Sequence, residues 1–155
     1  MTTAVPATGD VARMFDPRWD SLTNAVWDSF ARAWIAELSG RPEEPLPKLP
    51  VLFPDDPETT AGEFVVPMNF TASAESQWRF IDSVFRQAHD DNVLDHLAAG
   101  PIEQLLSKHG DAYIARFERL AREDNRFARM LSGCNKHLMS DAVWSRLQES
   151  IAHRP

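Results

Sequence analysis

The triplet His89-Asp90-Asp91 places side chains of types used in catalysis next to one another. A histidine beside aspartates can bind a divalent metal that activates water for hydrolysis. Such a centre needs further ligands, and no histidine precedes His89, so the ligand set is incomplete. Asp90 and Asp91 also lie where one expected helix ends and the next begins, which favours a capping role. A metal-dependent hydrolase or transferase with a site near these residues and His96 is therefore kept only as an alternative.

The other histidines and the single cysteine do not complete a recognised site. His96, His109 and His137 are spaced, relative to Cys134, in a way that matches no compact zinc pattern. Cys134 stands three residues before His137, but no acid is placed to orient that histidine as a base. A small buried cysteine is the interpretation we favour. No phosphate-binding loop, dinucleotide fingerprint or nucleophile elbow is present. We therefore expect no catalytic residue, no metal and no cofactor, and favour a non-enzymatic role.

Two groups of charged side chains are candidates for binding a partner. If one helix runs through the basic group, its side chains would project within an arc of about 80°. Acidic residues lie between them, so an ordinary solvated helix face is the alternative. The members of the basic group are Arg119, Arg122, Arg126 and Arg129. The acidic group lies in a proline-rich segment and would face a basic partner; its members are Glu43, Glu44, Asp55, Asp56 and Glu58. The sequence therefore predicts partner binding through charged surfaces.

Charge and composition limit the classes of function. The chain has 155 residues and a formal net charge of −7, and the negative charge is concentrated in residues 1–99. An acidic chain of this kind is a poor match for broad nucleic-acid binding, which depends on neutralising phosphates. With one cysteine, no internal disulfide can form, and no apolar run has the length of a signal peptide or a membrane span. We expect a cytoplasmic protein that binds a protein partner, with no membrane association and an open oligomeric state.

Apolar periodicity and helix-breaking residues divide a single domain, residues 1–155, into four parts. Residues 1–18 are expected to be a loose terminus, and 19–39 to hold a first helix that starts at Asp20 or Ser21. The seven prolines of residues 41–67 exclude a helix there and favour an extended loop. A minor β-hairpin between residues 51–53 and 64–66 is one option. Partial wrapping of the helices is another, through Leu49, Val51, Leu52 and Phe53.

Residues 73–152 are expected to form the helical core. The run from Leu97 to Gly110 predicts a helix end, a two-residue break at Gly100-Pro101 and a short helix that stops at a left-handed Gly110. Side chains that can cap helix N-termini precede the other apolar stripes, namely Ser73, Asp91, Asp111, Asp124 and Ser140. The fold class is all-α, with about six to seven helices. A compact bundle and a short stack both fit this pattern.

The chain resembles an uncharacterised family of small bacterial helical domains across residues 69–148. The likeness rests mainly on the string Gly-Pro-x-Glu-x-Leu-Leu-x-x-His-Gly, which runs from Gly100 to Gly110. It continues through Asn69-Phe70-Thr71-Ala72-Ser73, Gln77-Trp78, Phe80-Ile81, Phe127, Leu131 and Trp144. The resemblance implies a bacterial or phage source and an all-α fold, and it supplies no catalytic residue.

These observations lead to one functional hypothesis and two alternatives. The hypothesis is a non-catalytic protein-binding factor, similar to an immunity protein or an inhibitor, or an accessory subunit of a bacterial defence or toxin system. Small size, an acidic surface and the lack of a catalytic constellation support it. The alternatives are the metal-dependent enzyme described above and a homo-oligomeric scaffold.

Overall fold

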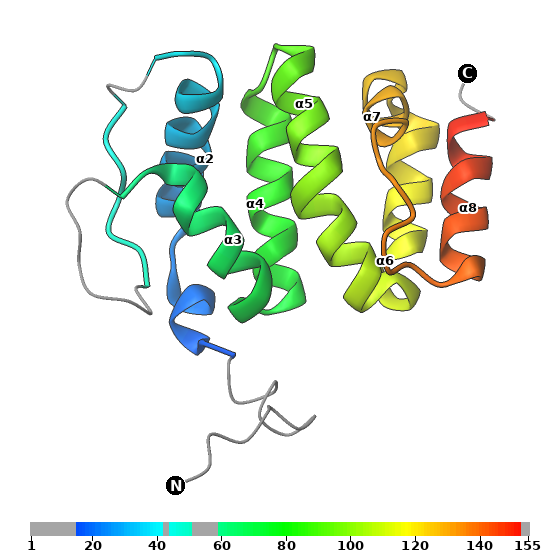
Figure 1. Cartoon of the computed structure of the whole chain (residues 1–155), viewed down its shortest axis with the longest axis horizontal. Coiled ribbons are helices and arrows are strands. Elements are labelled where there is room, and N and C mark those ends of the chain that lie inside the picture. The colour runs from blue at the N-terminus through cyan, green and yellow to red at the C-terminus, as the bar shows by residue number, and fades with distance from the viewer. Residues whose placement is uncertain (1–14, 42–43, 51–58, 153–155) are drawn as a thin grey trace, which may run out of the picture.

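The computed structural model describes residues 15–41, 44–50 and 59–152, and every regular element within them is helical. Figure 1 shows the main helices side by side, following one another along the long axis from α2 at one end to α8 at the other. The expected all-α class is confirmed, and the arrangement is a short stack rather than a closed bundle. The α-helices are α2 (Asn24–Leu38), α3 (Ala61–Thr71), α4 (Ala74–Gln87), α5 (Asp91–Leu97), α6 (Glu103–Glu123), α7 (Asn125–Leu131) and α8 (Asp141–Ala152).

The first α-helix begins later than predicted because a separate turn takes the residues before it. The 3₁₀-helix η1 (Pro17–Ser21) is capped by the Asp16 side chain and has proline in its first turn. Helix α2 then starts after Thr23, whose side chain accepts the Val26 N–H. Residues 15–18 are not loose, since the Asp16 N–H donates to Thr71 O at 2.8 Å. The predicted terminus is wrong for these residues, and residues 1–14 lie outside the described part of the chain.

Helix α3 contradicts the prediction that prolines keep residues 41–67 non-helical, because Pro67 lies inside it. Thr60 caps its N-terminus, and the Glu37 carboxylate of α2 accepts the Ala61 N–H at 2.8 Å and the Gly62 N–H at 3.3 Å. A carboxylate at this end also opposes the positive pole of the helix. The α3 N-terminus is therefore stabilised from another element, which offsets the backbone hydrogen bond that a proline removes.

The predicted hairpin is wrong, because residues 64–66 lie in α3, and residues 51–53 lie outside the described residues. Before that gap, Leu49 is buried with 5% of its surface exposed, and Leu46 packs against the core. Leu49 therefore packs against the helices as expected, whereas Val51, Leu52 and Phe53 lie outside the described residues.

Gly100 and Pro101 do not break the chain into two helices. Residues Ala98–Ile102 form a π-helix, η2, in which the Glu103 N–H reaches Ala98 O, and this turn joins α5 to α6. Proline has no N–H to donate, and a π-turn is one way for a helix to continue past an interrupted ladder. Pro101 is buried within this turn.

The predicted stop at Gly110 is a kink inside α6. His109 has φ −130° and ψ 27°, outside the helical region, and the helix continues to Glu123. Gly110 is needed for space rather than for a positive φ, since an added Cβ would lie 2.8 Å from Val143 Cγ2 of α8. Asp111 accordingly lies within α6 and caps no helix.

The remaining capping predictions are mostly confirmed. Ser73, Asp124 and Ser140 accept N–H groups at the starts of α4, α7 and α8. Helix α5 is capped by Asp90 rather than by the expected Asp91. In the described residues, no helix combines the length and the apolar character needed to cross a membrane.

Substitutions of Gly100 and Gly110, the first and last residues of the string that carries the family resemblance, should have opposite effects on stability. Gly110→Ala should lower the free energy of unfolding by about 1–3 kcal/mol, because its methyl group overpacks against Val143. Gly100→Ala is the matched control, since a Cβ there meets nothing within 4 Å, and it should raise stability by about 0.5–1 kcal/mol. Urea denaturation of both variants measures the difference. Equal effects from the two substitutions would contradict the packing role of Gly110.

Candidate functional site

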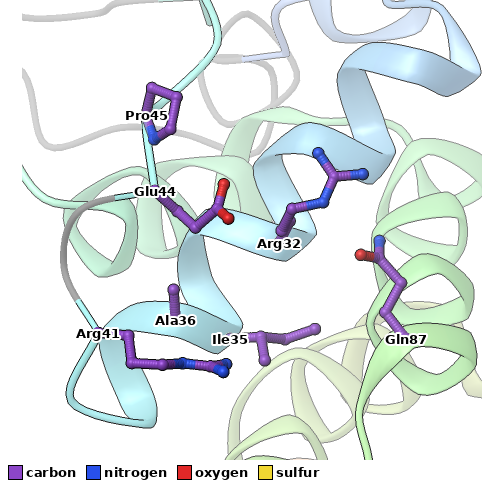
Figure 2. A pocket seen from close by; sticks show the side chains of 7 residues that line it. All are labelled: Arg32, Ile35, Ala36, Arg41, Glu44, Pro45 and Gln87. Carbon is purple, nitrogen blue, oxygen red and sulfur yellow. The ribbon is translucent and has the colours of Figure 1, made fainter.

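A surface pocket of about 400 Å³ lies beside the C-terminal half of α2 (Figure 2). Two guanidinium groups and one carboxylate provide its charged lining, while apolar side chains and an amide complete it. The pocket combines cationic donors with apolar surface in a volume typical of small-ligand sites. It is lined by Arg32, Ile35, Ala36, Arg41, Glu44, Pro45 and Gln87.

The end of α2 determines where Arg41 lies. Gly40 adopts φ +74°, the left-handed conformation that reverses the chain after a helix. The Arg41 N–H then donates to Ala36 O at 2.6 Å, and the Gly40 N–H donates to Glu37 O at 3.2 Å. This C-terminal motif returns the chain over α2 and places the Arg41 side chain on the same pocket as Arg32 (Figure 2).

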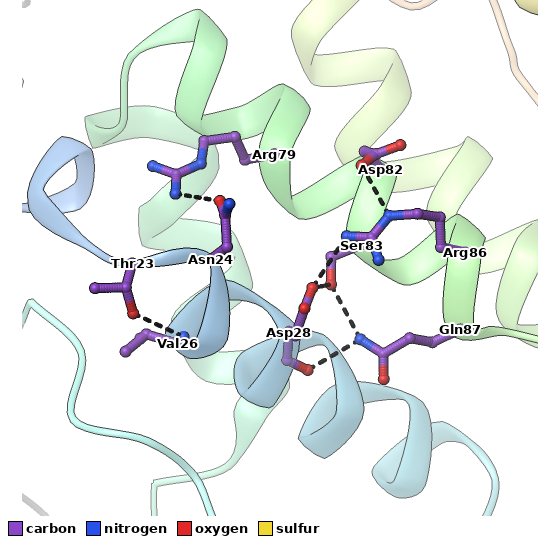
Figure 3. A network of polar contacts seen from close by, with 9 residues as sticks. All are labelled: Thr23, Asn24, Val26, Asp28, Arg79, Asp82, Ser83, Arg86 and Gln87. Carbon is purple, nitrogen blue, oxygen red and sulfur yellow. Dashed lines mark hydrogen bonds and ion pairs between the residues drawn. The ribbon is translucent and has the colours of Figure 1, made fainter.

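A polar network between α2 and α4 holds the opposite wall of the pocket (Figure 3). The Asp28 carboxylate accepts the Ser83 hydroxyl at 2.5 Å and the Arg86 guanidinium at 3.0 Å. Gln87 Nε2 donates to Asp28 O and to Ser83 Oγ, both at 3.0 Å. The Gln87 amide is therefore fixed in orientation where it meets the pocket.

Interactions within this network stabilise the charged forms of Asp28 and Arg86. The Ser83 hydroxyl and the Arg86 guanidinium hold the pKa of Asp28 below its usual value, and the charge of Arg32 acts in the same direction. Hydrogen bonds to Asp82 and Asp28 raise the pKa of Arg86. The guanidinium groups of Arg32 and Arg41 make no hydrogen bond or ion pair with another described residue.

Helix α3 presents a second candidate surface. Its inward residues Val65 and Met68 are buried, yet Val66 and Phe70 on its outer side are each 57% exposed. Glu63 is also exposed, and its spacing of three and seven from these two residues puts all three on one stripe. We call Glu63, Val66 and Phe70 the α3 stripe. Lys108 Nζ lies 5.3 Å from the Phe70 ring centre, so a cation borders this stripe.

The acidic candidates from the sequence lie mostly beyond the described residues. Of that group only Glu44 is described, and it is exposed at the arginine-lined pocket. Glu43, Asp55, Asp56 and Glu58 lie outside the described part of the chain. Sequence reasoning missed Arg32 and Arg41, because only the chain reversal at Gly40 brings them to one pocket.

The arginine candidates do not form one basic face. The helix assumed to carry them ends at Glu123, and Asp124 starts α7 in a new direction. Arg126 serves the fold, since its guanidinium donates to the Phe85 and Ala88 carbonyls at the end of α4 and lies 4.5 Å from the Phe85 ring centre. Arg119 and Arg122 are exposed on α6.

Among the histidine and aspartate candidates, Asp90, Asp91 and His96 have structural contacts, and His89 is exposed after α4. Asp90 Oδ1 accepts the Asn92 N–H, and Asp91 pairs with Arg129 at 3.4 Å. His96 Nδ1 lies 2.8 Å from Asn92 O. Nowhere in the described residues do three or more histidine, cysteine, aspartate or glutamate side chains gather as metal ligands would.

The carboxylate of Glu103 and the thiol of Cys134 are both buried at the junction between η2 and the loop after α7. Glu103 accepts the Asn135 N–H at 3.0 Å and is 7% exposed, so it anchors this loop rather than only opposing the helix dipole. Cys134 is buried against Ala98 O, as expected, and burial raises the pKa of its thiol. A deprotonated nucleophile is disfavoured in such surroundings.

A smaller pocket of about 300 Å³ lies at the α6 kink, between residues 106–112 and the start of α8. Partial burial and the neighbouring Lys108 charge lower the pKa of His109, which favours its neutral form. Burial likewise lowers the pKa of Lys108, whose ammonium group donates to Asn69 O. Lys108 thus connects α6 to α3.

The lowered pKa of Asp28 predicts a pH-dependent stability. A carboxyl group whose pKa is lower in the folded than in the unfolded protein stabilises the fold above its ordinary pKa of 3.8, and that stabilisation is lost as the pH falls through the folded value. Asp28→Asn should therefore be less stable than the parent at about pH 7, and the difference should narrow towards about pH 3.5. Asp95→Asn is the control, since Asp95 is exposed and its carboxylate has no hydrogen bond or ion pair with another described residue. Urea denaturation across this pH range is the measurement, and a constant Asp28→Asn difference would contradict the network.

Comparison with known proteins places the chain in a family without assigning an activity. A family of unknown function, DUF6869, matches residues 55–154, which include α3 to α8. No curated protein and no solved structure matches the chain. Because the match covers well over half of its length, the protein belongs to the family of unknown function DUF6869.

Proposed function

We propose that the protein is a non-catalytic binding factor that docks a protein partner on the α3 stripe. The observation that carries this proposal is the exposure of Val66 and Phe70 on a helix whose inner side is already buried. Leaving two large apolar side chains in water has a cost that a partner would remove on binding. Aromatic residues are also frequent anchors in protein interfaces.

The structure of α3 makes this surface rigid. The Glu37 carboxylate caps its N-terminus, and Thr71 near its C-terminus accepts the buried Trp19 indole N–H at 2.9 Å. A helix fixed at both ends presents its side chains without further ordering, which reduces the entropy lost on association.

Charge decides the kind of partner. Glu63 extends the α3 stripe and Lys108 borders it at Phe70, while the whole chain carries a net charge of −7. Two copies of an acidic chain repel each other, whereas a basic partner is attracted and steered to this surface. We therefore assign the stripe to a basic protein with an apolar side chain at its centre.

Such a partner fits an immunity- or inhibitor-like factor, or an accessory subunit of a bacterial defence or toxin system. The acidic composition supports that class. The single cysteine, which is reduced and buried, agrees with a cytoplasmic location.

Removing the two apolar side chains of the stripe should abolish binding without unfolding the protein. In Val66→Ala/Phe70→Ala, exposed groups are lost from a helix that tolerates alanine, so the melting temperature should stay close to that of the parent. A partner co-purified from the native host, then purified, should bind this variant about thirty-fold more weakly or worse. Titration calorimetry measures this change.

The matched control is Leu138→Ala, which removes a 74% exposed apolar side chain from the loop before α8. It should leave affinity unchanged. Equal binding by the double variant and the parent would refute the proposal. Sedimentation experiments cover the scaffold alternative: a concentration-dependent dimer that the double variant dissociates would assign the α3 stripe to a second copy instead.

A further inference from the structure

We infer that the pocket beside α2 binds a small oxyanion, the carboxylate or phosphate group of a low-molecular-weight ligand. Arg32 lines this pocket from α2 and Arg41 from the turn after it, and neither guanidinium group makes a hydrogen bond or ion pair with another described residue. Arginine stays charged at every physiological pH, and its planar group matches both anions with two parallel hydrogen bonds.

These two arginines differ from most others in the described residues. Arg86 is held by Asp28 and Asp82, Arg126 by backbone carbonyls, and Arg146 by Glu118. In each case the fold itself uses the donor groups. Arg32 and Arg41 keep theirs, in a pocket of about 400 Å³.

The rest of the lining accounts for how a ligand would be held. Ile35 and Ala36 supply apolar surface for a carbon skeleton. Gln87 Nε2 is already committed to Asp28 O and Ser83 Oγ, so its carbonyl oxygen is the atom left to accept a ligand donor. The two guanidinium groups are therefore the lining donors that remain for an anionic group.

Among the described residues, two guanidinium groups and one carboxylate line the pocket, and the carboxylate is that of Glu44. Its position makes it a competitor for the same donors. This predicts that Glu44→Gln binds anions more tightly than the parent, a gain that loss of folding cannot produce. The site uses no side chain of the α3 stripe, so it does not depend on the proposed partner.

The test is a two-dimensional NMR titration of the full chain at constant ionic strength, with inorganic phosphate in one arm and succinate in the other. We expect saturable shifts of the Arg32, Arg41 and Gln87 side-chain signals in at least one arm. The arm that saturates at lower concentration identifies the preferred anion.

Variants make the assignment specific. Arg32→Gln and Arg41→Gln should each weaken binding about ten-fold, and Glu44→Gln should strengthen it a few-fold. Arg119→Gln is the matched control, since it removes the same charge from an exposed position on α6, and it should change nothing. Shifts that fail to saturate in both arms, or equal weakening by Arg119→Gln, would overturn the inference.

Discussion

The packing of one aromatic cluster underlies the first half of the molecule. Trp19 of η1 lies 5.9 Å from Trp27 and 6.2 Å from Phe30 between ring centres, and Phe80 of α4 lies 4.7 Å from Phe30. All four side chains have 1% or less of their surface exposed. Burying so much aromatic surface dominates the energetics of a domain of this size. This packing sets the relative placement of η1, α2 and α4. It therefore also positions the wall of the pocket and the surface against which α3 packs.

Polar contacts between elements that are distant in the sequence then fix the positions of helix ends, which apolar burial alone does not specify. Asp20 accepts the hydroxyls of Ser73 and Ser76, each at 2.5 Å, which ties η1 to the start of α4. Glu37 does the same for α3 from the end of α2. Each of these acids satisfies donors at or near a helix start, and a helix start needs such partners wherever its N–H groups are removed from water. Acidic residues in the first half of the chain therefore stabilise the fold in addition to giving the surface its negative charge.

The second half depends on a wide turn and a kink. The π-turn of Ala98–Ile102 joins α5 to α6, and Glu103, directly after it, anchors the loop that leads to α8. The kink at His109 and the missing side chain at Gly110 let α8 approach α6. Glu103 and Gly110 of this string therefore serve packing, whereas an added Cβ at Gly100 would meet nothing within 4 Å. Function is then to be sought on surfaces that packing does not use, which are the α3 stripe and the arginine-lined pocket.

The sequence by itself determined the helical class, the apolar stripes of α2 and α4, and the caps at Ser73, Asp124 and Ser140, because each depends on residues within a few positions of one another. Proline and glycine misled the prediction for the opposite reason. Pro67 is tolerated in α3 because Glu37 of α2 supports that helix, and Gly110 is required by Val143 of α8. The pocket could not be predicted from the sequence either, since Arg32 and Arg41 come to line one pocket only when the chain reverses at Gly40. Local patterns specify elements, whereas support from another element, close approach and shared pockets exist only once the elements are packed together.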